Sequence, residues 1–183
     1  SATKSTLTNA ANVSRDGYGD MAQDAFVPNA HAVWKLSDQM NLGISITSPW
    51  GLVTDYDGDF AGRFFGTTSS IKTTNVKPVL AYRFENGLSV GAGPQLQYMN
   101  ARLAKAVGYG TGEGNSDVTG DDLAAGWTAG VNWEVVPGTR IGASYVSEIK
   151  HHLKGDIKFD SAAEAGGYVD QSAKADVTTP EFV

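Results

Sequence analysis

The residues of this sequence that could carry out chemistry are scattered and form no catalytic motif. The run GYGTGEG at 108–114 is rich in glycine like a phosphate-binding loop, but it lacks the Lys-Ser/Thr pair that such loops need. The carboxylates of DYDGD at 55–59 suit calcium, but they lack the spacing and the closing Glu of a calcium-binding loop. His151 and His152 are adjacent, so in a strand they point to opposite faces and cannot easily share a metal ion. We therefore expect no enzyme, no metal site and no cofactor.

The composition disfavours several other classes of function. The 183 residues include 14 Lys and Arg against 20 Asp and Glu, so the net charge is −6 and binding of nucleic acid is not expected. The chain has no cysteine, which excludes disulfides and thiolate metal ligands. No apolar run approaches the ~18 residues of a membrane-spanning helix. A membrane β-barrel stays possible, because its strands alternate apolar and polar residues.

Six segments alternate apolar and polar residues with a period of two, which is the pattern of β-strands. They are 25–36, 41–53, 73–85, 88–105, 123–136 and 139–159, and a seventh strand begins near Ala173. In the first four strands we expect even-numbered apolar residues such as Ile44 and Leu80 to face outward. The polar residues expected inside are Lys35, Asn75, Lys77, Arg83, Gln95 and Gln97.

The connections between these segments alternate between short and long. Short turns are expected at 37–39, 85–87 and 136–139, and long polar loops at 55–68, 107–122 and 160–172. Barrels of the outer membrane have short periplasmic turns and long extracellular loops. Aromatic residues near both ends of the strands fit two interfacial girdles: Trp34, Tyr82, Phe84 and Trp133 at the short turns, and Trp50, Tyr98 and Trp127 towards the long loops. The pattern predicts an all-β, antiparallel transmembrane β-barrel segment at 25–183, preceded by an extracellular loop at 1–24.

The number of strands is too small for a closed barrel. Bacterial single-chain barrels have an even number of strands from eight upward, and an open edge in lipid leaves backbone groups unpaired. We therefore expect about six to seven strands of a larger barrel, with the remainder missing from this chain. The alternative from the pattern alone is a soluble β-sheet binding or adhesion module. A barrel enzyme is a third possibility, but the sequence shows no nucleophile with a base beside it.

Longer stretches of the sequence resemble the FadL family of outer-membrane transporters of hydrophobic compounds. The resemblance is carried by VPN (27–29), SITSPWGL (45–52), AYRFENGLSVGAGPQLQY (81–98), GWTAGVNWEV (126–135), YVSEIKHHLKGD (145–156) and VTTPE (177–181). It implies a fourteen-stranded barrel with an N-terminal hatch, of which this chain matches the second strand to the start of the eighth. It also implies the bacterial outer membrane as the location.

The resemblance implies a lateral exit for the transported molecule. In the family, ligand leaves the barrel sideways through a kinked strand, and the kink corresponds here to Ser48, Pro49, Trp50 and Gly51, bordered by Ala25 on the preceding strand. The residue types agree, because Pro49 lacks the N–H that a ladder needs and Gly51 tolerates irregular backbone. An ordinary strand end is the alternative interpretation.

The resemblance also implies a ligand pocket. The family holds a fatty-acid carboxylate with basic residues, one of which corresponds to Lys105, beside the apolar Met99 and Leu103. The alternative is that Lys105 is a solvated lysine at a strand end. The implied function is passive transport of long-chain fatty acids or aromatic hydrocarbons into the lipid of the outer membrane.

Overall fold

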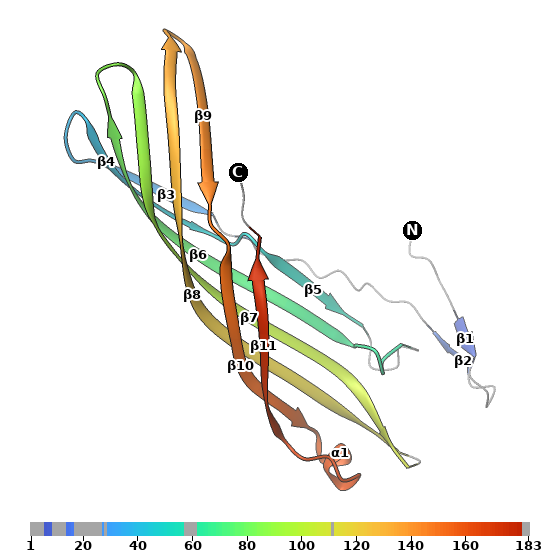
Figure 1. Cartoon of the computed structure of the whole chain (residues 1–183). Helices are drawn as coiled ribbons and strands as arrows, with labels where there is room; N and C mark the ends of the chain where they lie inside the picture. Colours follow the sequence, from blue (N-terminus) through green and yellow to red (C-terminus); the bar gives the residue numbers. More distant parts are fainter. Residues whose placement is uncertain are drawn as a thin grey trace.

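The protein forms a long, curved antiparallel β-sheet (Figure 1). The computed structural model describes residues 6–8, 14–16, 27, 29–56, 62–110 and 112–180. The strands of the sheet are β3 (Ala30–Lys35), β4 (Met40–Thr47), β5 (Gly51–Asp55), β6 (Thr68–Arg83), β7 (Leu88–Tyr109), β8 (Gly112–Val136), β9 (Thr139–Val146), β10 (Ile149–Phe159) and β11 (Gln171–Thr179). The short strands β1 (Thr6–Thr8) and β2 (Ser14–Asp16) pair with each other.

The nine strands of the sheet occupy seven positions side by side. The order across the sheet is β11-β10-β8-β7-β6-β4-β3, while β5 follows β4 along β6 and β9 precedes β10 along β8. This order confirms the predicted all-β barrel segment of six to seven antiparallel strands. The three predicted short turns are confirmed and lie at the top of Figure 1. At the opposite end a longer connection joins β10 to β11, but only residues 110–111 separate β7 from β8, so the predicted strict alternation of short and long connections is wrong there. Gly87 and Gly138 in two of the turns have φ near +81° and +87°, a conformation that favours glycine.

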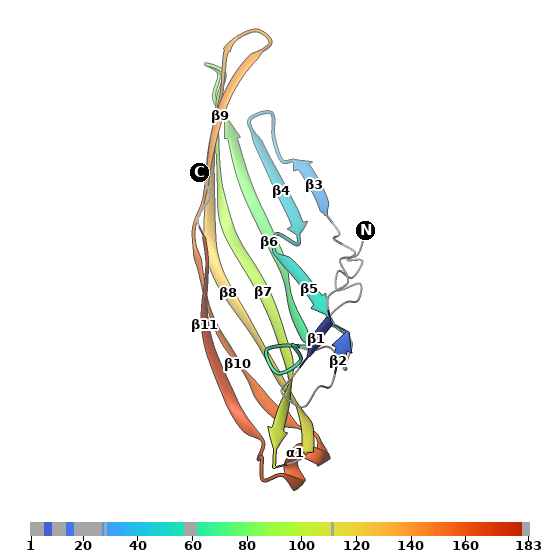
Figure 2. The same cartoon turned by 90° about the vertical axis from the view of Figure 1, so that its right-hand side faces the viewer.

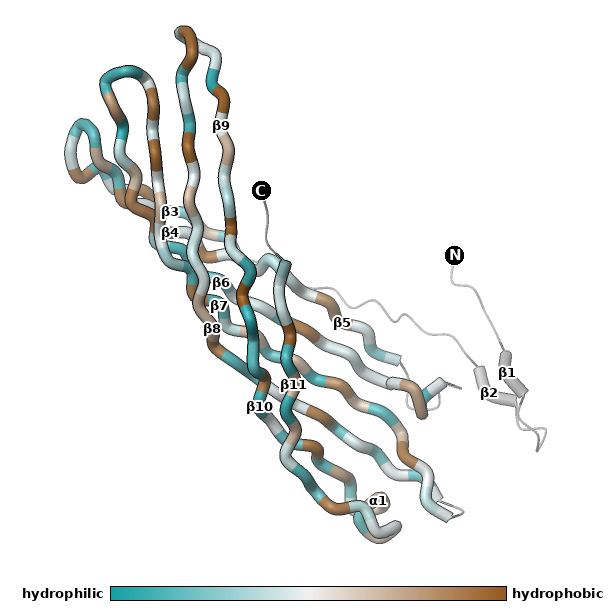
Figure 3. Tube along the Cα trace, viewed as in Figure 1, coloured by the Kyte–Doolittle hydropathy of each residue, from teal (hydrophilic) through white to brown (hydrophobic). Residues whose placement is uncertain are grey.

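The two faces of the sheet differ in polarity. Side chains of the non-adjacent strands β7 and β10 touch each other across β8, as in the 2.9 Å contact between Gln97 and His151, and this is only possible on the concave face. Gln97 is 2% exposed, whereas Leu80 on the other face is 46% exposed. Figure 3 shows hydrophobic and hydrophilic residues interspersed along the strands, and Figure 2 shows the curvature of the sheet.

The predicted faces are confirmed at 30–35 in the first strand, up to Thr47 in the second, and throughout the third and fourth; residues 25, 26 and 28 of the first strand lie outside the described residues. The register places Ser45 beside Lys77 and Asn75 beside Gln97 on the concave face, and Ile44 on the convex face.

The predicted loop at 107–122 is wrong, because strands β7 and β8 continue to Tyr109 and Gly112 as one long hairpin. The reason lies in the convex residues of β8. Between Leu123 and Val135 the large residues on this face are apolar and exposed, but from Asp121 to Glu113 the face carries Asp121, Thr119, Asp117, Asn115 and Glu113. A strand with polar residues on both faces shows no hydrophobic alternation, so its sequence resembles a loop.

The predicted strands at 41–53 and 139–159 are each interrupted. The first breaks at 48–50, between β4 and β5, and the second at 147–148, between β9 and β10. Thr47 pairs with Asn75 and Gly51 with Lys72, so four steps along one strand match three along its partner. The second break likewise inserts one residue opposite β8. Both breaks therefore act as β-bulges that shift the register by one residue.

These shifts reverse the side-chain alternation beyond each break. Leu52 pairs with Ile71 and so lies on the concave face, although the sequence pattern grouped it with the outward Leu42. Ile149 and Leu153, grouped in the sequence with the exposed Ile141, are only 2% and 6% exposed on the concave face. A one-residue insertion has this effect because strand side chains alternate strictly.

Outside the strands, the described residues contain one regular element. The short helix α1 (Ser161–Ala165) lies in the predicted loop 160–172, and among the described residues no helix is long and apolar enough to cross a membrane. Of the predicted outer loop at 1–24, the description covers only β1 and β2, and Ala25 lies outside the described residues.

Candidate functional site

The two strand breaks face a common cavity on the concave side of the sheet. Its volume is about 150 Å³, and its polar floor comes from β6 and β7 while the breaks and the end of β11 form its sides. It is lined by Pro49, Trp50, Asn75, Lys77, Gln95, Gln97, Val146, Ser147, Ile149, Thr179 and Pro180. Residues from five well-separated parts of the sequence therefore meet at one place in the barrel wall.

The first break is held to the sheet by hydrogen bonds to one residue of β6, Thr73. Thr73 is 2% exposed, and its hydroxyl accepts from the Trp50 N–H at 2.9 Å and donates to the Trp50 carbonyl at 2.7 Å. The Ser48 hydroxyl donates to the Thr73 carbonyl at 2.6 Å. Side chains thus replace ladder bonds where Pro49 has no N–H to contribute.

The second break is closed in a similar way by Ser147. Its backbone N–H donates to the Trp127 carbonyl at 3.0 Å, and its hydroxyl accepts from the Trp127 N–H at 3.0 Å. On the other side, the Thr179 hydroxyl accepts from the Ile149 N–H at 3.2 Å. The sequence analysis predicted a continuous strand here, so it missed this half of the site.

The floor of the cavity is a directed chain of hydrogen bonds. Gln95 Nε2 donates to the Ser147 carbonyl at 3.0 Å, and Asn75 Nδ2 donates to Gln95 Oε1 at 3.2 Å. The Gln95 side chain can cross β8 because the β8 residue between Gln95 and Ser147 is Gly126, which has no side chain. A Cβ at this position would be 2.6 Å from Ser147 Oγ and 2.8 Å from Gln95 Nε2. The chain of bonds ends at Asn75 Oδ1, which has no hydrogen-bond partner in the described part of the protein.

A buried histidine extends this polar cluster. His151 is 0% exposed, and its Nε2 lies 2.9 Å from Gln97 Oε1 while its Nδ1 lies 3.1 Å from Asp122 Oδ2. His152 points to the opposite face and contacts Asp176, as its adjacency in a strand predicted. The sequence offered no signal for the role of His151, because its partners lie 29 and 54 residues away.

The predicted pocket residues Met99, Leu103 and Lys105 lie on the concave face of β7. Met99 is buried, whereas Leu103 and Lys105 are exposed. Six residues separate Met99 from Lys105, or about 20 Å at ~3.3 Å per residue. Lys105 has no ion-pair partner among the described residues, and these three side chains line a stretch of wall rather than one enclosed pocket.

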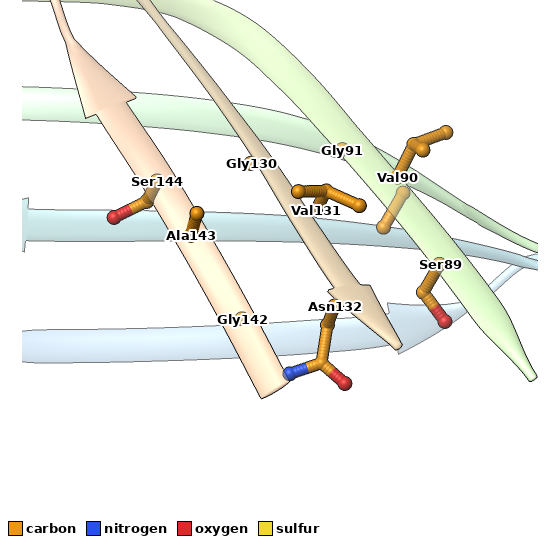
Figure 4. A pocket seen from close by; sticks show the side chains of 10 residues that line it. Ser89, Val90, Gly91, Gly130, Val131, Asn132, Gly142, Ala143 and Ser144 are labelled. Atoms are coloured by element: carbon orange, nitrogen blue, oxygen red, sulfur yellow. The ribbon is translucent and has the colours of Figure 1, made fainter. Parts of the chain in front are cut away.

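A second hollow lies nearer the short turns (Figure 4). Its volume is about 400 Å³, and small residues such as Gly91, Gly130 and Gly142 line most of it. It contains no charged side chain, so it offers nothing to hold an ionic group. In the part of the chain that the structure describes, no three His, Asp or Glu side chains come together as a metal site.

A curved antiparallel sheet with an apolar convex face and a polar, interrupted concave face belongs to the wall of a transmembrane β-barrel. The sequence profile of the outer membrane protein transport family (OMPP1/FadL/TodX) matches residues 2–183, and the chain belongs to this family of outer-membrane proteins. This membership favours the barrel over the soluble binding or adhesion module.

Individual relatives agree with the family assignment. The chain is 30% identical to a long-chain fatty acid transport protein of Escherichia coli O6:H1 over 162 residues, which cover 76% of this chain and 36% of the relative. It superposes on a Pseudomonas aeruginosa FadL homologue with a TM-score of 0.75 and 20% identity, over 92% of this chain and 44% of the other. For the Ralstonia pickettii toluene transporter TbuX the TM-score is 0.65 and the sequence identity is 21%. This superposition covers 90% of this chain and 49% of the transporter. The chain thus spans under half the length of these relatives.

Proposed function

We propose that the protein containing this chain is a passive channel of the bacterial outer membrane for long-chain fatty acids or related hydrophobic molecules, including aromatic hydrocarbons. The observation that carries the proposal is the break in the barrel wall at 48–50, which opens beside an amphipathic cavity. The relative in Escherichia coli is named as a long-chain fatty acid transporter and the one in Ralstonia pickettii as a toluene transporter. Relatives that are transport proteins support transport rather than catalysis.

The break at 48–50 is proposed as the lateral exit. In lipid a barrel normally hides all backbone polar groups by ladder pairing, so an irregular segment persists only where it is satisfied in another way. Here Thr73 satisfies the backbone of Trp50, and Ser48 bonds to Thr73. The wall can therefore depart from regular pairing next to the lipid, and Ala25 on the preceding strand would border the gap.

The stretch of Met99, Leu103 and Lys105 is proposed as the ligand-binding wall nearer the outer end. The buried Met99 and the half-exposed Leu103 provide apolar contact, and the ammonium of Lys105 provides a partner for a carboxylate. The convex band of exposed apolar residues, such as Leu96, Leu123 and Ile141, would contact the lipid of the outer membrane.

The experiment that tests the function is uptake of radiolabelled oleate and toluene by vesicles that contain the full-length protein. We expect uptake above that of empty vesicles. Replacing Ser48 with Arg and Ala25 with Glu should plug the exit and abolish most of the uptake. A matched variant, Ser45→Arg, places the same bulk on the concave face of β4 before the break and should leave the exit open. Undiminished uptake by the plugged variant would exclude the lateral route.

A further inference from the structure

The cavity between the two strand breaks carries a cationic side chain that the ligand-binding wall does not use. Lys77 lines the cavity from β6, is half-buried, and has no ion-pair partner among the described residues. The register of β6 and β7 places it beside Gln95, ten residues along β7 from Lys105. Ten residues correspond to about 33 Å, so Lys77 and Lys105 belong to separate sites on the same face.

The surroundings of Lys77 contain buried polar atoms that find no hydrogen-bond partner among the described residues. Asn75 is 4% exposed, and its Oδ1 has no donor within the described part of the chain. Its Nδ2 donates to Gln95, whose own amide donates to the Ser147 carbonyl, so these bonds fix the orientation of the Asn75 amide. The hydroxyl of Thr47, the register partner of Asn75, also lacks a hydrogen-bond partner in the ranges that the structure describes. Such atoms are costly unless a partner satisfies them.

We propose that this cavity is a second binding site for the carboxylate head of an amphiphile, with Lys77 as the residue that holds the carboxylate beside the exit. An ammonium has three donors, so one can satisfy Asn75 Oδ1 while two remain for the oxygens of a carboxylate. The proposal rests on the proposed transport function and deepens it.

The shape and the sides of the cavity fit such a head group. A cavity of 150 Å³ in an apolar interior holds a single benzene ring, so the cavity of about 150 Å³ here accommodates a carboxylate and the first methylenes but not a whole chain. The apolar residues Pro49, Val146 and Ile149 line its sides, and Pro49 belongs to the break itself. A head group at Lys77 would therefore leave its alkyl tail beside the lateral gap.

The test uses the full-length protein with bound oleate and a water-soluble carbodiimide. The reagent activates the carboxylate, and a lysine in contact forms an amide with it while the reagent leaves as its urea. Mass spectrometry of the digested protein then identifies the modified lysine. We expect oleoyl amide on Lys77 and not on Lys72, which lies on the same strand but faces outward. Methyl oleate, which has no free carboxylate, should give no product.

A second measurement separates this proposal from the transport function. In vesicles, Lys77→Met should slow uptake of oleate about tenfold, the factor expected for one charge-assisted hydrogen bond, while uptake of methyl oleate stays unchanged. Lys77→Arg should restore oleate uptake, and Lys72→Met should have no effect. If oleate is taken up but Lys77 is neither modified nor required, the second site is refuted and the channel stands. If no vesicle takes up either compound, the transport function itself is refuted.

Discussion

The sharpest structural prediction concerns Gly126 on the concave face of β8. A methyl group at this position would lie 2.6 Å from Ser147 Oγ, 2.8 Å from Gln95 Nε2 and 2.9 Å from Ile149 Cγ1. All three atoms belong to the floor or the side of the cavity. Gly126→Ala should therefore displace the second strand break and the hydrogen-bond chain together.

The expected loss of stability follows from the contacts that are displaced. Forcing an extra methyl into a packed site costs about 1–3 kcal/mol. The hydrogen bonds from Gln95 Nε2 to the Ser147 carbonyl and from the Trp127 N–H to Ser147 Oγ are each worth about 1 kcal/mol. Neighbouring side chains can move and relieve part of this strain. We therefore expect the free energy of unfolding to fall by about 2–4 kcal/mol in total.

The measurement is urea unfolding of the full-length protein in lipid vesicles, followed by tryptophan fluorescence. Gly120→Ala is the matched control, because it lies on the same strand and face but its new methyl would be 3.5 Å from its nearest neighbour, Leu153 Cβ. Ser147→Gly in the Gly126→Ala background removes the closest atom and should restore part of the stability, with a coupling of about 0.5–3 kcal/mol. Equal stability of the Gly126 and Gly120 variants would show that the cavity is not packed as described.

Three further predictions address other parts of the chain. Thr73→Val removes both hydrogen bonds of the Thr73 hydroxyl to the Trp50 backbone and should lower the free energy of unfolding by about 1–3 kcal/mol, whereas Thr74→Val on the convex face should cost nothing measurable in the same urea assay. Lys105→Ala should weaken oleate binding about tenfold and leave toluene binding unchanged in equilibrium binding assays, and an equal loss for both ligands would make Lys105 a structural residue. The Asp160 carboxylate caps the start of α1 by accepting a hydrogen bond from the backbone N–H of Ala163, and this bond lowers the pKa of Asp160 below its ordinary value of 3.8. The cap should therefore be intact above pH 3.8 and be lost as the pH falls through the lowered pKa. Asp160→Asn should remove this pH dependence in hydrogen exchange of the Ala163 amide, and an unchanged profile would contradict the capping role.

The sequence predicted the parts of the fold that depend on local alternation. Within β6 and β7 every polar residue expected inside lies on the concave face, because these strands run without interruption and therefore keep strict alternation. The outer part of the β7–β8 hairpin could not be predicted this way. Residues such as Asp117 and Thr119 are polar on a face that lies beyond the apolar band, so the period-two signal disappears although the ladder continues.

The site itself was only half visible in the sequence. Pro49 marks the first break, because a residue without an N–H cannot continue a ladder. The second break contains Ser147 and Glu148, which are both compatible with a strand, and it is stabilised by Trp127 and Thr179 from distant positions. Its location depends on tertiary hydrogen bonds, which no local pattern records.

The two bulges also explain how a barrel wall can present an amphipathic cavity on a polar lumen. Strict alternation would turn Leu52, Ile149 and Leu153 towards the lipid together with the other apolar residues of their strands. Each one-residue insertion reverses the alternation, so these side chains point to the concave face, where Ile149 forms a side of the cavity above the polar floor of Gln95 and Asn75. A site that must hold a charged head and a hydrocarbon tail needs both surfaces side by side. The bulges produce that combination from strands whose sequence pattern remains that of a lipid-facing barrel.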